Sequence, residues 1–158
     1  MDSLELRAVS AEDDDFLCRV YAASRADEMS LVAWDEAAKQ SFLQMQFAAQ
    51  QAHYRAYFSK ASHDVILAEG APVGRLYVDQ RETEIRILDI GLLPERRGHG
   101  IGSRVLQDLM EEAKAANKTL SIYVEDSNPS LRLFQRLGFV KAGENDISYL
   151  MEWHPSGK

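Results

Sequence analysis

The feature that most constrains this chain is a glycine-rich segment, residues 92–103, lying between two different apolar patterns. The run before it, residues 85–93, is mostly apolar and predicts a strand. The residues after it have apolar side chains at helical spacing, and these are Val105, Leu106, Leu109, Met110 and Ala113. Glycines at every second position of the connecting loop remove side chains, so its N–H groups can approach a ligand closely. Because the first turn of a helix adds further N–H groups and a positive dipole end, the segment predicts a phosphate-binding site.

The spacing of the loop residues narrows down the kind of phosphate site. The glycines at 98, 100 and 102 do not fit G-x-G-x-x-G, because Ser103 stands where the third glycine of that motif would fall. No Gly-Lys-Ser/Thr is present, which excludes a P-loop. The run from Arg97 to Gly102 fits R-x-x-G-x-G and resembles the acetyl-coenzyme A pyrophosphate loop of the GNAT superfamily of N-acetyltransferases. The alternative is a glycine-rich surface turn with basic flanks, but three glycines opening a helix would then lower its stability without a purpose.

A second motif lies further along the chain. Residues 128–139, with Asn128, Leu133-Phe134 and Gly138-Phe139, resemble the second GNAT signature of an asparagine, a leucine-tyrosine pair and a glycine-phenylalanine pair. Here the asparagine is one residue nearer the glycine than in many members, and the usual tyrosine is Phe134. The separation of the two motifs and the order of the expected strands and helices also resemble those of the family, along essentially the whole chain.

The order of the remaining patterns predicts the fold class. Strands are expected at 4–9, 63–69, 73–78, 84–93, 120–124, 139–142 and 148–153, and helices at 12–21, 35–57, 100–117 and 130–137. The chain is therefore expected to be α+β, or mixed α/β, with a central, twisted, mostly antiparallel sheet of about seven strands and about four flanking helices. We expect residues 1–158 to form a single acetyltransferase domain with a frayed tail at 154–158.

Two patterns carry further structural expectations. The helix that begins after Asp35 is expected to bury an apolar face made of Ala38, Phe42, Met45, Ala49 and Ala52. The closing strand, residues 148–153, is a candidate for pairing across a homodimer.

Composition limits the class of partner. The net charge of −7 argues against a nucleic-acid or anionic-membrane surface and favours a cationic or amine-bearing acceptor. The single cysteine, Cys18, excludes an internal disulfide and suggests a reducing compartment, so a cytoplasmic protein is expected. No membrane-length apolar run and no signal-peptide pattern occur. His53 and His63 lack metal-ligand spacing with other residues, so no metal is expected.

The resemblance assigns the cofactor-binding residues. It implies that the pantetheine arm of acetyl-coenzyme A (acetyl-CoA) pairs with the backbone of Ile90 and Leu92, and that the Leu92 amide donates to the thioester carbonyl. It also implies a pyrophosphate cradle, made of Arg97, Gly98, His99, Gly100, Ile101, Gly102 and Ser103. A solvated side chain is the alternative for His99. Asn128 is expected to reach the pantetheine amides, with a helix N-cap as an equal and compatible alternative, and Phe134 occupies the position of the family's tyrosine.

The catalytic groups are less well defined by the sequence. Asp89 interrupts an apolar run and is the candidate general base; a salt bridge to Arg86 or Arg75 is the alternative. Glu84 on the same strand and Glu125 at the end of the next are further candidate bases, although Glu84 lies near a turn and is expected to be solvated. Because Phe134 has no hydroxyl, the usual acid is missing, and the position of Tyr123 cannot be judged from the sequence.

The resemblance implies direct transfer of an acetyl group from acetyl-CoA to a primary amine of a small molecule or peptide, in a ternary complex. The main alternative is a non-catalytic acyl-coenzyme A sensor or interaction module, which Phe134 supports, and transfer to a hydroxyl also stays open.

Overall fold

The computed structural model describes residues 3–155, so most of the tail expected to fray lies outside the described residues. The strands are β1 (Leu4–Ala8), β2 (Ser62–Ala68), β3 (Ala71–Gln80), β4 (Glu84–Leu92), β5 (Thr119–Glu125), β6 (Val140–Glu144) and β7 (Ser148–Trp153). The helices are α1 (Asp14–Ser24), α2 (Ala26–Met29), α3 (Glu36–Tyr57), α4 (Ile101–Ala116) and α5 (Leu131–Arg136), with short 3-10 turns at Ala11–Asp13 and Pro94–Arg96. The order of strands and of the long helices agrees with the sequence prediction.

The strands form one sheet with the order β1-β2-β3-β4-β5-β7-β6. β1 is antiparallel to β2, and β7 is antiparallel to both β5 and β6. Backbone bonds from Leu93 to Val73 and from Arg81 to Glu84 show that β3 and β4 are also antiparallel, because the residue numbers fall along β4 as they rise along β3. β4 and β5 are parallel, with Glu84 opposite Thr119 and Ile87 opposite Ile122. The predicted mixed, mostly antiparallel fold is confirmed.

Backbone contacts divide the chain into two compact units. The first contains the residues up to Leu76 together with Ile90–Arg96, and the second contains Tyr77–Asp89 together with the residues from Arg97 onward. β3 and β4 therefore contribute to both units.

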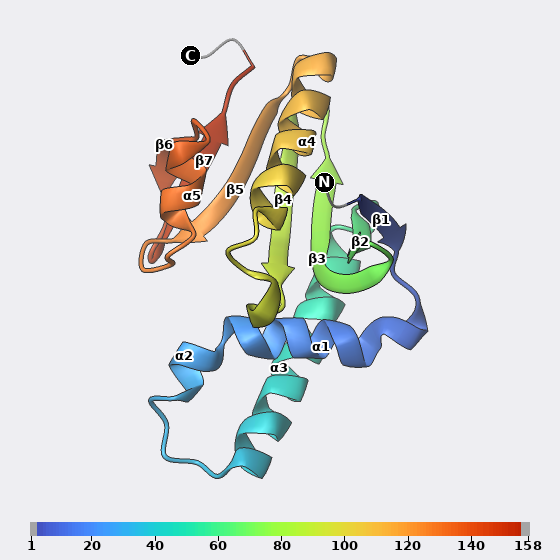
Figure 1. Ribbon diagram of the computed structural model, residues 1–158. Helices are drawn as coiled ribbons and strands as arrows, with labels where there is room; N and C mark the ends of the chain where they lie inside the picture. Colours follow the sequence, from blue (N-terminus) through green and yellow to red (C-terminus); the bar gives the residue numbers. More distant parts are fainter. Residues whose placement is uncertain (1–2, 156–158) are drawn as a thin grey trace. The chain divides into compact units, whose positions relative to one another are not determined.

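In the first unit, α1 crosses α3 (Figure 1). Leu17 and Tyr21 from α1 pack on Phe47 from α3, with the two aromatic rings 5.7 Å apart. α3 begins where predicted, because the Asp35 carboxylate accepts the N–H of Ala38 at 2.8 Å and caps the helix. These contacts fix the crossing of the two long helices of this unit.

The buried face of α3 differs from the predicted one. Phe47 is buried, and the neighbouring half-buried positions follow it at helical spacing: Lys39, Leu43, Gln46, Gln50 and Tyr54. Most of the predicted face, by contrast, is exposed: Ala38, Ala49 and Ala52 are exposed and Met45 is 62% exposed, and only Phe42 is half-buried. Sequence periodicity identified an apolar stripe on α3, but the side of the helix that is buried is a different one.

In the second unit, α4 lies along β4 and β5 (Figure 1). Its buried face consists of Ile101, Val105, Leu106, Leu109 and Ala113, which agrees with the predicted helical spacing. β7 lies between β5 and β6, so both of its edges are already paired. The expectation that the strand at 148–153 pairs across a dimer is therefore wrong, because β6, and not β7, lies at the edge of the sheet.

β3 and β4 approach each other closely at Gly74 and Gly91, both in the first unit. A Cβ atom added at Gly74 would collide with the carbonyl oxygen of Gly91 and lie 2.7 Å from Cδ2 of Leu92. Only glycine fits there without moving the end of β4.

We therefore predict that Gly74→Ala lowers the free energy of unfolding by about 1–3 kcal/mol, because the added methyl group meets backbone that cannot rotate away. Chemical denaturation of the purified protein measures this. Gly143→Ala in β6 is the matched control, since its added Cβ comes no closer than 3.9 Å to any neighbour. Equal stability of the two variants would contradict the close approach of β3 and β4.

Candidate functional site

The loop between β4 and α4 has the backbone conformation that its glycines allow. Gly98 and Gly100 have φ angles of 77° and 81°, in the left-handed region that other residues rarely occupy. A Cβ atom added at either glycine would have nothing within 4 Å, so the space beside the loop is open. The backbone conformation therefore requires glycine at both positions. Because glycine has no side chain, the backbone of the loop is bare on its outer side.

The loop leads directly into the N-terminus of α4. Gly100 is the N-cap residue, and the N–H of Arg104 is bonded to its carbonyl at 3.0 Å. The N–H groups of Ile101, Gly102 and Ser103 precede that first bond and belong to the helix turn that has no intrahelical acceptors. Ile101 is buried and anchors the turn, whereas Gly102 and Ser103 are half-buried. The result is a 16-residue helix with the positive end of its dipole next to a bare loop.

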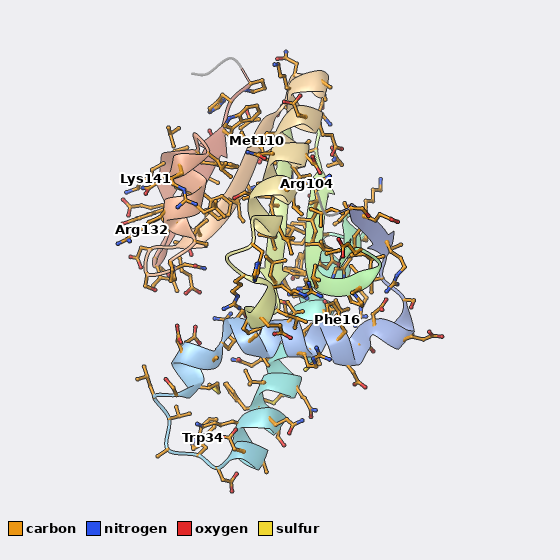
Figure 2. The ribbon with its side chains drawn as sticks, in the orientation of Figure 1. Phe16, Trp34, Arg104, Met110, Arg132 and Lys141 are labelled. Atoms are coloured by element: carbon orange, nitrogen blue, oxygen red, sulfur yellow. The ribbon has the colours of Figure 1, made fainter. Side chains whose placement is uncertain are left out.

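Basic side chains surround this loop. Arg96, Arg97 and His99 are exposed, and Arg104 projects from the first turn of α4 (Figure 2). Glu95 is the only acid between Leu92 and Arg104 in the sequence. The loop is therefore locally cationic in a chain of net charge −7, as an anion-binding site requires.

The C-terminal end of β4 belongs to the first unit. The N–H of Leu93 donates to the carbonyl of Val73 on β3 at 2.9 Å. Glu84, at the other end of β4, also faces β3, because the N–H of Arg81 donates to its carbonyl, so the alternation of hydrogen-bonding groups is interrupted once between Glu84 and Leu93. Ile90 and Leu92 lie between these two points. Both residues are half-buried. This is the backbone that the sequence predicts to pair with a pantetheine arm.

Asn128 and Phe134 lie at α5 in the second unit. The Asn128 side-chain oxygen accepts the N–H of Ser130 at 2.9 Å, which orders the turn that leads into α5. The N-cap of α5 is Ser130 itself, so the expectation that Asn128 caps this helix is wrong. Phe134 is 2% exposed and meets Phe139 edge-on, with ring centroids 5.2 Å apart. The ring at the position of the family's tyrosine is thus part of the core of this unit.

The candidate acids have different surroundings. Glu84 is held by Ser121, which donates to its carboxylate, and by Arg86 at 3.0 Å. Burial raises the pKa of Glu84, but the Ser121 hydrogen bond and the charges of Arg86 and Arg81 outweigh burial, so the pKa is lowered overall. The expectation that Glu84 is simply solvated is wrong, because the parallel β4–β5 register places Ser121 beside it.

Asp89 and Glu125 are both half-buried. Of the two arginines considered as partners for Asp89, Arg86 pairs with Glu84 and stacks on Tyr123, 5.0 Å from the ring centroid. The other, Arg75, bonds to Gln50. The base and ion-pair interpretations of Asp89 both remain predictions.

Comparison with known proteins decides the family. A model of the acetyltransferase (GNAT) family matches residues 19–139, from α1 to the residue before β6. The chain belongs to the GNAT acetyltransferase family. A comparison with curated protein sequences finds no match.

Solved structures share the GNAT fold at low sequence identity. The PaiA N-acetyltransferase of Thermoplasma acidophilum, in complex with coenzyme A, has a TM-score of 0.73 and 18% identity, over 96% of this chain and 99% of that one. The ribosomal-protein-S18-alanine N-acetyltransferase of Escherichia coli has a TM-score of 0.64 and 16% identity, over 98% and 94%. RimL, a ribosomal L7/L12 alpha-N-protein acetyltransferase in complex with coenzyme A, has a TM-score of 0.63 and 18% identity, over 99% and 96%.

One buried group of this GNAT protein was missed by sequence reasoning. Arg75 on β3 is 1% exposed, donates to Gln50 of α3, and lies 5.6 Å from the centre of the Phe47 ring. Burial, together with the charge of Arg75, lowers the pKa of His63 to about 4, so His63 is neutral at physiological pH. The signal available in the sequence was a lone arginine between Gly74 and Leu76 in an apolar strand.

Residues 3–155 were expected to contain neither a metal site nor a membrane-spanning helix. No group of three or more His, Cys, Asp or Glu side chains among them is placed to hold a metal ion. None of the helices in this part of the chain combines the length and the apolar character needed to span a bilayer.

Proposed function

We propose that this GNAT protein transfers an acetyl group from acetyl-CoA directly to a primary amine in a ternary complex. The observation that carries the proposal is the bare loop at Gly98 and Gly100, in the left-handed conformation, opening onto the N-terminus of α4. Two of the structural relatives reported above are complexes with coenzyme A, which supports acetyl-CoA as the donor.

The pyrophosphate is proposed to bind between the loop and α4. Arg97, Gly98, His99 and Gly100 would contribute the loop backbone and positive charge, and Ile101, Gly102 and Ser103 the first-turn N–H groups of the helix. Backbone donors hold phosphate oxygens at fixed positions, while the arginines add charge that does not depend on an exact geometry.

The pantetheine arm is proposed to pair with the backbone of Ile90 and Leu92, at the C-terminal end of β4. The Leu92 amide would then donate to the thioester carbonyl and stabilise the negative charge that develops on its oxygen. Asn128 can hold the Ser130 N–H through its side-chain oxygen and offer its amide NH₂ to a pantetheine carbonyl.

Proton transfer is proposed to involve Asp89. The attacking amine must lose a proton, and a half-buried carboxylate a few residues before Leu92 is a candidate acceptor, directly or through water. Phe134 cannot supply the hydroxyl that protonates the leaving group in the resembled family. A thiolate with an intrinsic pKa of roughly 8.5 is nevertheless a tolerable leaving group near neutrality.

A covalent acetyl-cysteine intermediate is not part of the proposal. Cys18, the only cysteine in the sequence, packs against the Leu17, Tyr21 and Phe47 cluster. Burial, with a contribution from the charge of Asp15, raises the pKa of its thiol, which makes it a weaker nucleophile at neutral pH.

The acceptor is proposed to be a small-molecule or peptide amine, in the cytoplasm. Two of the relatives above are named for acetylating ribosomal proteins, which supports an amine acceptor, and the net charge of −7 favours a cationic one. The alternative is a non-catalytic acyl-coenzyme A sensor, which the burial of Phe134 in place of a tyrosine favours.

Release of free coenzyme A distinguishes an acetyltransferase from a non-catalytic sensor. We predict that the wild-type protein, mixed with acetyl-CoA and a panel of amines that includes polyamines and peptides, releases thiol faster than hydrolysis alone and forms an N-acetyl product detectable by mass spectrometry. Tight binding of acetyl-CoA without release on any amine would instead support the sensor.

Binding at the loop is tested by Gly100→Val. A branched side chain at a φ of 81° strains the loop and covers the proposed pyrophosphate site, so we predict that calorimetry shows more than about tenfold weaker coenzyme A binding. Gly70→Val is the matched control, because Gly70 has the same φ of 81° and equally open surroundings, in the turn between β2 and β3. Equal affinities in the two folded variants would remove the loop from the binding site.

The base is tested by Asp89→Asn, which keeps the shape of the side chain and removes its charge. If Asp89 accepts the proton, turnover falls by about two to four orders of magnitude while coenzyme A affinity holds. Glu84→Gln is the control: its carboxylate is held by Ser121 and Arg86, so we expect a lower melting temperature with turnover retained in the folded protein. Normal turnover by folded Asp89→Asn would show that Asp89 is not the base and would make Glu125 the next candidate.

A further inference from the structure

The peptide group that joins Gly91 to Leu92 has an orientation set by β3. A Cβ atom added at Gly74 would lie closer to the carbonyl oxygen of Gly91 than to its carbonyl carbon, which would be 3.2 Å away, so this carbonyl points at Gly74. The peptide is trans, and a trans peptide directs its N–H opposite to its C=O. The N–H of Leu92 therefore points away from Gly74.

A second contact to this segment comes from α1, which passes the C-terminal end of β4 (Figure 1). A Cβ atom added at Gly91 would lie 3.0 Å from Cγ1 of Val20, closer than nearly all real Cβ contacts. The Val20 methyl group thus occupies the space of the side chain that Gly91 lacks. The φ angle of Gly91 lies outside the left-handed region, so this position requires glycine because of Val20 and not because of its backbone conformation.

Val20 is itself held firmly. It is 2% exposed, and Leu17 and Tyr21 on the same helix pack on Phe47 of α3. The hydroxyl of Tyr21 also donates to the side-chain oxygen of Gln46 at 3.3 Å. Because close-packed side chains resist compression, α1 is a rigid support for the end of β4. All of these residues belong to the first unit.

We propose that Val20 is a positioning residue for the acetyl transfer: by packing on Gly91, it keeps the Leu92 N–H aimed at the thioester carbonyl. The inference rests on the proposed function, in which this N–H stabilises the negative charge that develops on the carbonyl oxygen. A donor lowers the barrier only while it is aimed at that oxygen, so a small displacement reduces the rate more than the affinity. The proposed pyrophosphate contacts, at residues 97–103, do not include Val20 or Gly91.

Val20→Ala tests the proposal on the full chain. The change removes the methyl group that packs on Gly91, so we expect kcat to fall about tenfold while KM for acetyl-CoA changes less than about twofold. Val65→Ala is the matched control, because it removes the same atoms from a fully buried valine on β2. We expect this control to lower the melting temperature and to retain kcat in the folded protein.

Gly91→Ala provides the reciprocal change. It adds the methyl group that Val20 excludes, and we expect kcat to fall by a similar factor. In the double variant Val20→Ala/Gly91→Ala, the added Cβ occupies the space that Val20 vacates, so kcat should return to within about threefold of wild type. Two variants that act only through stability are not expected to restore turnover when combined.

The outcomes separate the role of Val20 from the proposed function. If the wild type acetylates an amine but Val20→Ala keeps its kcat, or if the double variant is slower than both single variants, the positioning role is overturned and the proposed function stands. A wild-type protein that releases no coenzyme A with any amine overturns the proposed function and this inference together.

Discussion

The left-handed backbone at Gly98 and Gly100 is the constraint on which the proposed chemistry of this protein depends. Two residues with φ angles near 80° turn the chain from β4 into α4 and leave no side chain on the outer side of the turn. Every substitution there costs conformational energy, since only glycine visits this region freely. The same turn brings the positive end of a long helix and several arginines to one short segment, and this combination binds phosphate.

Much of the fold and of this loop could be predicted because both depend on local features. The glycine spacing, the helical spacing from Val105 to Ala113 and the cap at Asp35 each act within one or two turns of chain. The side of α3 that is buried could not be found in the same way. An apolar stripe in the sequence does not by itself show which side of a helix the rest of the chain covers, and in α3 the buried side is the one that carries Phe47.

The position of β7 and the surroundings of Glu84 and Arg75 depend on contacts between residues far apart in sequence. In the sequence Glu84 is a residue next to a turn, but the parallel register with β5 sets Ser121 opposite Arg86, where its hydroxyl donates to Glu84. In the sequence Arg75 is a candidate partner for Asp89, but α3 supplies Gln50 and Phe47 as its contacts. β7 follows β6 in sequence but takes the interior position, because it pairs with β5 on one side and with β6 on the other. Such pairings are set by the whole sheet and carry no short sequence pattern.

The most direct test of the central claim is an amide chemical-shift titration of the labelled protein with coenzyme A. The account predicts that the largest shifts fall on the N–H groups of Gly98 to Ser103, with further shifts at Ile90 to Leu92. Repeating the titration with pantetheine, which lacks the pyrophosphate, should preserve the shifts in β4 and remove those in the loop. If the N–H signals of Gly98 to Ser103 did not shift at saturating coenzyme A, the proposed binding of the pyrophosphate at this loop would be contradicted.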